Sequence, residues 1–171
     1  GGISKYICEL NKNLIKKKFN STIFSPISIN ENLNFYKVSK INFFKLYKIP
    51  NFCTKFFYLV NDVLTFFFIL FKKPSLIHLT YYNTFLAKLI NIPFTLTVYD
   101  LTHEKLKLLN KKFDKKYLIN KASKIICISK STRDDLIKYY KVEENKIKVI
   151  YLGVNQKKIV NIRKKKIIIY I

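Results

Sequence analysis

The chain is poor in the residues that usually build metal sites and redox centres. Its 171 residues include 3 cysteines, 2 histidines, 3 glycines, no methionine and no tryptophan. Cys8, Cys53 and Cys127 are widely separated, and no second metal ligand lies beside any of them, so a zinc site is disfavoured. An odd number of scattered thiols is typical of reduced, buried cysteines in a cytosolic protein. We therefore expect no metal and no tightly bound cofactor.

Acidic residues and arginine are also scarce. The chain has 10 acidic and 33 basic residues, which gives a formal charge of +23. Among the basic residues, only Arg133 and Arg163 are arginines, and all the others are lysines. Bidentate recognition of phosphate and guanine favours arginine, so the scarcity of arginine disfavours nucleic acid as a partner. A lysine-rich surface is still attracted to anionic membranes and polyphosphates.

Long apolar runs are limited to one segment. The run at 63–71 is interrupted only by Thr65, and residues 52–71 together predict a long, mostly apolar helix. A clean span of a bilayer needs about 20 apolar residues, so this segment is short. We expect a buried helix here, and peripheral contact with a membrane surface is the alternative that the sequence leaves open.

Strand and helix patterns alternate along the chain, and its hydrophobic fraction of 49% suits one domain with a real core. The predicted strands cover 21–24, 35–44, 75–80, 94–99, 124–128, 147–151 and 167–171. The predicted helices cover 3–18, 52–71, 84–90, 105–122 and 131–140. Alternation of this kind indicates an α/β fold, with a Rossmann-like parallel sheet and helices on both of its faces.

Ionisable side chains follow the strand predicted at 94–99. Asp100, His103 and Glu104 come together directly after it, and His78 lies near the end of the preceding strand. Ligands of parallel sheets bind beyond the carboxyl ends of the strands, so these positions are candidates for a site. The alternative is that Asp100 caps the next turn and His103 is a surface residue.

Two helix starts carry small polar residues or glycine. Gly1 and Gly2 precede the first helix, where free N–H groups and the absence of a Cβ suit a phosphate, although a simple turn explains them as well. Ser129 and Ser131 begin the helix near 131–140. Ser131 and Asp134 resemble a capping box, so a capping role is favoured over a ligand role.

Four segments match one family in order and spacing. They are 1–6, 77–82, 97–104, and 122–136 taken with 147–155. Together they resemble the N-terminal domain of retaining glycosyltransferases of family 4, which have the GT-B fold. The resemblance implies transfer of a hexosyl group from a nucleotide-sugar to a polysaccharide or lipid-linked acceptor, with retention and without a metal.

The resemblance also assigns roles by position. Gly1 and Gly2 match the loop near the donor phosphates, and Asp100 and His103 match a cleft-lining loop as catalytic residues. Tyr99 matches a position that faces the acceptor, and His78 lies at a matching strand end, where acceptor binding and a purely structural role are both open. Many family members have a histidine where this sequence has Tyr99, and a phenol cannot replace the proton chemistry of an imidazole near neutral pH.

The resemblance further implies a division of the chain. Residues 1–160 are expected to form the acceptor-side domain without its first strand, so the GT-B domain is incomplete. Residues 161–171 are expected to form a linker and the first strand of a missing donor-binding domain. The chain alone is then expected to be inactive and cytoplasmic, with the inner face of a membrane left open. An inactive remnant, or a module that binds sugar or membrane without catalysis, is the alternative.

Overall fold

A four-stranded parallel sheet forms the centre of the protein in a computed structural model that describes residues 2–29, 33, 38–46, 50–106 and 115–153. Its strands are β5 (Ile77–Leu79), β6 (Phe94–Val98), β7 (Lys124–Cys127) and β8 (Ile147–Val149), in that spatial order. Every neighbouring pair is parallel. This arrangement confirms the α/β fold with a parallel sheet that the alternating pattern predicts.

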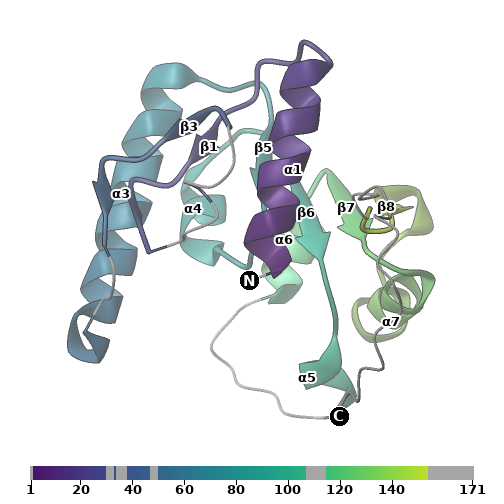
Figure 1. Ribbon diagram of the computed structural model, residues 1–171. Coiled ribbons are helices and arrows are strands. Elements are labelled where there is room, and N and C mark those ends of the chain that lie inside the picture. The colour runs from purple at the N-terminus through teal and green to yellow at the C-terminus, as the bar shows by residue number, and fades with distance from the viewer. Residues whose placement is uncertain (1, 30–32, 34–37, 47–49, 107–114, 154–171) are drawn as a thin grey trace, which may run out of the picture.

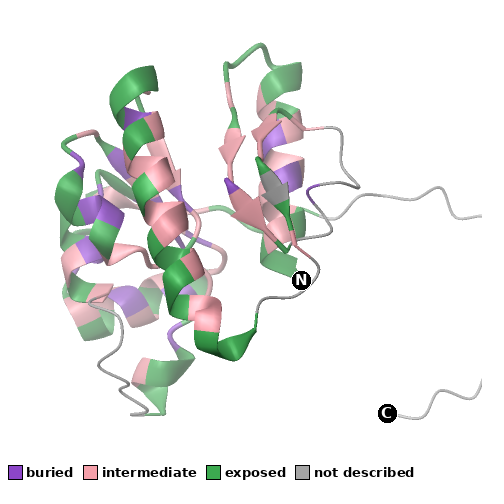
Figure 2. Cartoon of the chain, turned by 90° about the vertical axis from the view of Figure 1, so that its left-hand side faces the viewer, coloured by how far each residue is buried: buried purple, intermediate pink, exposed green. Residues whose placement is uncertain are grey.

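Helices connect these strands and cover the sheet on both faces. They are α4 (Thr84–Leu89), α5 (Thr102–Lys105), α6 (Lys115–Lys121) and α7 (Lys130–Tyr140), and a short 3₁₀ helix η2 (Glu144–Lys146) precedes β8. Figures 1 and 2 show α1 (Gly2–Lys16) on one face and α4 with α6 on the other. The helix predicted over 105–122 is described only at its two ends, since 107–114 lie outside the described residues.

The core lies where β6 and β7 meet these helices. β6 is buried on both faces, as expected for a central strand of a covered parallel sheet. The buried cluster consists of Leu79, Ala87, Phe94, Leu96, Val98, Leu101, Leu118, Ile119, Ala122, Ile125, Cys127, Leu136 and Val142. This rigid centre holds the loops that follow each strand.

The first part of the chain forms two smaller parallel pairs. β1 (Ile23–Phe24) pairs with β3 (Lys40–Ile41), and β2 (Ile27–Ser28) pairs with β4 (Phe44–Lys45). Buried Asn11 on α1 holds this region, because its amide donates to the Ser21 carbonyl at 3.0 Å and accepts from the Ser39 N–H at 3.1 Å. The strand predicted at 35–44 is therefore two short strands, with 34–37 outside the described residues.

One prediction about burial is wrong. The helix expected at 52–71 is present as η1 (Asn51–Cys53) followed by α3 (Thr54–Lys72), but Ile69 is its only buried residue. Two of its polar side chains, Asn61 and Asp62, form hydrogen bonds with residues outside the helix, and the Thr65 hydroxyl donates to the helix backbone. Apolar side chains of the helix are therefore left facing outward. By length and composition alone the segment Asn51–Lys72 could cross a membrane, and one such helix is weak evidence for a span.

Candidate functional site at the carboxyl edge of the sheet

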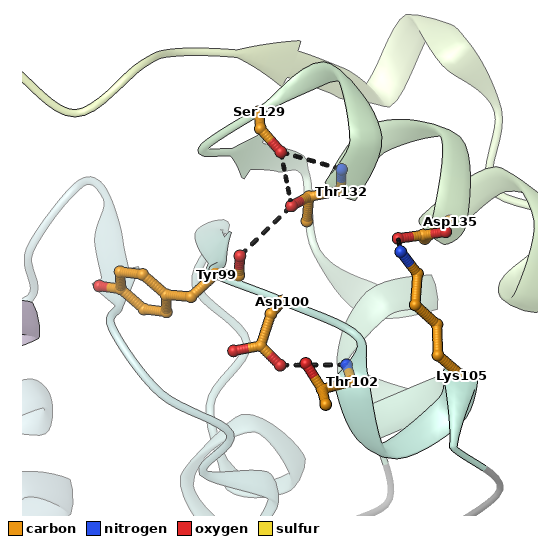
Figure 3. Close-up of polar contacts among 7 residues, drawn as sticks. All are labelled: Tyr99, Asp100, Thr102, Lys105, Ser129, Thr132 and Asp135. Atoms are coloured by element: carbon orange, nitrogen blue, oxygen red, sulfur yellow. Dashed lines mark hydrogen bonds and ion pairs between the residues drawn. The ribbon is translucent and has the colours of Figure 1, made fainter. Parts of the chain in front are cut away.

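The parallel strands bring the loops that follow β6 and β7 to the same edge of the sheet. Tyr99 and Asp100 follow β6 directly, and Ser129 and Thr132 lie just beyond β7. A hydrogen bond joins the two loops, since the Thr132 hydroxyl donates to the Tyr99 carbonyl at 3.3 Å (Figure 3). The hydrogen bond brings the backbone of Tyr99, directly before Asp100, next to the start of α7 that Ser129 caps.

Asp100 is exposed and holds the start of α5. Its Oδ1 accepts a hydrogen bond from the Thr102 N–H at 3.1 Å. His103 is exposed on the same short helix. Within the part of the chain that the structure describes, no hydrogen bond or ion pair joins Asp100 to His103. The two side chains share one loop and are open to solvent, but they do not form a preassembled acid–base pair.

Tyr99 points away from this loop and toward α1, as Figure 3 shows. Its ring meets Tyr6 of α1 edge to face, with centroids 6.2 Å apart. The hydroxyl is buried and has no hydrogen-bond partner among the described residues. Burial, with a smaller effect of Tyr6, raises the pKa of Tyr99 to about 12. Tyr99 is therefore a neutral phenol at physiological pH.

His78 lies within the sheet. It is the middle residue of β5, and its Nε2 is 2.7 Å from the Thr97 hydroxyl on β6. Burial lowers the pKa of His78, so the neutral imidazole is favoured. Its contact joins two neighbouring strands, and the structure does not link it to Asp100 or Tyr99.

Gly2 is the first residue of α1, whereas Gly1 lies outside the described residues. A Cβ placed on Gly2 would meet nothing within 4 Å, and the residue is exposed. The first turn of α1 has no acidic residue, and the positive end of the helix dipole there favours an anion. Because Tyr6, one turn further on, contacts Tyr99, this helix end lies at the carboxyl edge of the sheet.

Ser129 is the N-cap of α7. Its hydroxyl accepts from the Thr132 N–H at 3.1 Å and lies 2.9 Å from the Thr132 hydroxyl. Ser131 is exposed inside the helix, so the capping box predicted from Ser131 and Asp134 is wrong by two residues. β7 ends at Cys127, and the extended backbone at Ser129 (φ −153°, ψ 162°) lets that residue turn the chain into the helix.

Comparison with known proteins identifies the family. The model for glycosyltransferase family 4 matches residues 1–158. The chain belongs to glycosyltransferase family 4. A crystal structure of a glycosyltransferase from Rickettsia africae ESF-5 is similar, with a TM-score of 0.55 and 24% identity over 91% of this chain. The match covers 40% of that protein, and at this identity the likeness shows a shared fold. No curated protein matches the sequence.

The family 4 chain also contains a buried ionic cluster that the sequence does not reveal. The Glu104 carboxylate accepts from the Tyr140 hydroxyl at 2.6 Å and pairs with Lys115 at 2.9 Å. The Glu104 and Lys115 side chains are only 7% and 13% exposed. Burial raises the pKa of Glu104, but the hydrogen bonds from Tyr140 and Lys115 lower it more, so the net shift is downward.

This cluster fixes the loop after β6 in place. It joins α5, α6 and α7, and the Lys115 ammonium also lies 4.7 Å from the centre of the Tyr82 ring. Burial is the main reason that the pKa of Tyr82 is raised, and the negative charge of Glu104 adds to it. The cluster therefore positions Asp100 and His103 through α5. Glu104 and Tyr140 are 36 residues apart, so no local pattern predicts their contact.

The cysteines of this family 4 chain are free thiols rather than site residues. Cys8 and Cys127 are buried and Cys53 is half-buried, which agrees in part with the expected buried thiols. Burial raises the pKa of Cys127 to about 11, and a protonated thiol is a poor nucleophile and metal ligand. Within the described ranges, no group of three or more His, Cys, Asp or Glu residues lies close enough together to hold a metal ion.

Proposed function

We propose that this chain is the acceptor-side half of a retaining glycosyltransferase. In the proposed reaction a hexosyl group moves from a nucleotide-sugar to a polysaccharide or lipid-linked acceptor in the cytoplasm, at the inner face of a membrane. Family 4 membership and the fold support transferase activity in general. We further propose that a separate donor-binding domain completes the site and that residues 1–171 alone do not turn over a nucleotide-sugar.

The observation that carries this proposal is the contact between Tyr6 and Tyr99. It holds the N-terminal end of α1 beside the carboxyl end of β6, where Asp100 begins the next loop. A departing nucleoside diphosphate gains negative charge, which N–H donors and a helix N-terminus stabilise. In this proposal the backbone N–H groups of Gly1 and Gly2 face the donor phosphates.

The exposed loop after β6 supplies the proposed acceptor contacts. The Asp100 carboxylate and the His103 imidazole are both open to solvent at this edge, where they can accept or donate hydrogen bonds to sugar hydroxyls. We propose these two as the catalytic residues of this half. Tyr99 and His78 support that loop and its strand from within the fold, and their proposed acceptor contacts require movement of the Tyr99 ring or of the His78–Thr97 hydrogen bond.

A specific observation favours a second candidate function, a sugar-binding module without catalysis. By the family resemblance, Tyr99 stands where many members have histidine; in the structure its hydroxyl is buried, and it stays protonated at physiological pH. A chain that binds donor and acceptor but lacks this proton-transfer group would retain affinity without turnover. An assay that measures both sugar binding and nucleoside diphosphate release on the same protein distinguishes the two candidate functions.

The experiment that tests the donor site compares two substitutions of Gly2 in the complete enzyme. Gly2→Ala adds a methyl group in open space, so donor affinity should stay within about twofold, because the site is not crowded. Gly2→Asp places a carboxylate beside the proposed diphosphate, and like-charge repulsion should weaken donor binding about tenfold. The readout is the dissociation constant of a bound nucleotide-sugar, found by calorimetry with a panel of nucleotides.

Asn13→Asp is the matched control, since it adds the same charge in the exposed last turns of α1. The residue lies roughly 16 Å along the helix from Gly2, at 1.5 Å per residue. A carboxylate at a helix N-terminus stabilises the helix, so Gly2→Asp should not unfold the protein. Equal donor affinity for Gly2→Asp and Asn13→Asp would rule out a donor phosphate at this helix end.

A further inference from the structure

Two polar residues in the middle of α3 form hydrogen bonds with other parts of the protein. The Asn61 Oδ1 accepts from the Ile27 N–H of β2 at 2.8 Å, and Asp62 accepts from the Asn83 amide at 2.6 Å. Phe68 stacks on Phe24 of β1, with centroids 4.0 Å apart. These contacts fix the rotation of the helix about its own axis, so one side of α3 is committed to the fold.

The opposite side of α3 is apolar and exposed. We call it the α3 face, and its residues follow helical spacing: Phe56, Leu59, Val63, Phe67, Leu70 and Phe71. Their side chains are between 39% and 82% exposed. Figure 2 shows α3 toward the viewer, with exposed and half-buried residues along nearly its whole length. A continuous apolar face of this size marks an interaction surface, because soluble surfaces rarely leave one uncovered.

Charge decides between two occupants of the α3 face. Lys55 lies at its beginning and Lys72 and Lys73 at its end, all exposed, and the only acidic residue between them, Asp62, bonds inward. A second copy of the chain packed on this face would bring its own Lys55, Lys72 and Lys73, and a formal charge of +23 on the chain as a whole. An anionic lipid surface instead offers opposite charge to the lysines and apolar acyl chains to the aromatic residues.

We propose that the α3 face docks onto an anionic lipid bilayer, with α3 lying in the plane of the membrane surface. A transmembrane orientation would break the hydrogen bonds of Asn61 to β2 and of Asp62 to Asn83, and would place a carboxylate in the hydrocarbon core. In-plane docking keeps both bonds and buries only the apolar side. This inference does not depend on the proposed transfer reaction.

A single tryptophan tests the contact, because the chain contains none. Phe67→Trp places an indole on the α3 face of the full 171-residue chain, and its emission should shift to the blue on vesicles of phosphatidylcholine with phosphatidylglycerol. Tyr151→Trp is the matched control, since Tyr151 is exposed and follows β8 at the far side of the sheet from α3 (Figure 1). An equal shift in both variants, or no shift in either, would overturn the proposal.

Co-sedimentation with the same vesicles measures the strength of docking. Phe56→Glu combined with Phe67→Glu should lower the partition coefficient at least tenfold, because each change removes a buried aromatic ring from the interface. Tyr151→Glu carries the same kind of change and should leave partition unchanged. Far-ultraviolet circular dichroism confirms that each variant is folded.

The lysines test the role of lipid charge. Lys55→Gln with Lys72→Gln should lower partition several-fold on vesicles that contain phosphatidylglycerol, and leave the weaker binding to phosphatidylcholine alone unchanged. Partition that is equal with and without phosphatidylglycerol would overturn the proposal. So would a concentration-dependent dimer, seen by light scattering without lipid, that Phe67→Glu abolishes.

Discussion

Tyr6 and Tyr99 meet edge to face, with their ring planes at 87°, and this contact joins the first helix to the end of the central strand. It has two consequences for the site. It places the N-terminal end of α1 at the same edge as Asp100, and it leaves the Tyr99 hydroxyl buried without a partner among the described residues.

Tyr99→Phe removes a buried hydroxyl and keeps the ring that packs on Tyr6. An unsatisfied buried polar group costs free energy, so the substitution should leave the free energy of unfolding unchanged or raise it by up to about 1 kcal/mol. Urea unfolding of both proteins measures the difference. Destabilisation by more than about 1 kcal/mol would mean that the hydroxyl has a partner outside the described residues.

Ser129→Ala and Ser131→Ala form a matched pair, because both remove a hydroxyl near the start of α7. Only Ser129 accepts a hydrogen bond from the helix backbone, through the Thr132 N–H. Ser129→Ala should therefore cost about 1 kcal/mol of unfolding free energy, and Ser131→Ala less than half of that. Equal costs would show that Ser129 is not the functional cap.

Glu104→Gln tests the buried cluster through pH. The folded-state pKa of Glu104 lies below its ordinary value of 4.5, so its stabilising contribution is complete above that value. The contribution disappears as the pH falls through the lower, folded-state pKa. The stability lost by Glu104→Gln should therefore be largest near pH 7 and shrink below about pH 4.5.

Urea unfolding at several pH values provides the measurement. Glu143→Gln is the control, since that side chain is exposed and the residue contributes its backbone carbonyl to η2. A stability difference between Glu104→Gln and the original protein that stays constant from pH 7 to pH 3 would contradict the assigned ion pair.

The sequence predicts the centre of this fold well, since 94–99 is rich in β-branched and aromatic residues and 124–128 is a short apolar run, each beside clear turn signals. Asn83 and Ser129 also provide local caps for the helices that follow. The first part is harder, because β1 to β4 contain two residues each and depend on contacts such as that of Asn11 with Ser39. Such contacts join segments that are far apart in the chain, so they produce no periodic pattern in the sequence.

The sequence also does not predict which side of α3 meets the protein or which residues form the ionic cluster, and the reason is related. A helix that is apolar all around shows no preferred face, so only Asn61 and Asp62 mark the side that meets the protein. The Glu104–Lys115–Tyr140 contacts join three helices, and each partner alone resembles an ordinary surface residue. The sequence places Asp100 and His103 directly after a central strand, but only the structure shows that no bond joins these two described residues.

Tyr99→His in the complete enzyme tests whether this position limits catalysis. An imidazole titrates near neutral pH and a phenol does not, so the substitution should raise the turnover number if proton transfer occurs here. Tyr99→Phe is the matched control and should leave turnover unchanged or lower. Turnover that is the same for histidine and phenylalanine would separate Tyr99 from the transfer step.

Sugar transfer by the complete enzyme tests the central claim most directly. The enzyme is incubated with a panel of nucleotide-sugars and with lipid-linked or polysaccharide acceptors, and nucleoside diphosphate release and product configuration are measured. We predict acceptor-dependent release with retention at the anomeric carbon, and no multiple turnover by residues 1–171 alone. Inversion, or the absence of transfer from every donor by a folded complete enzyme, would contradict the account.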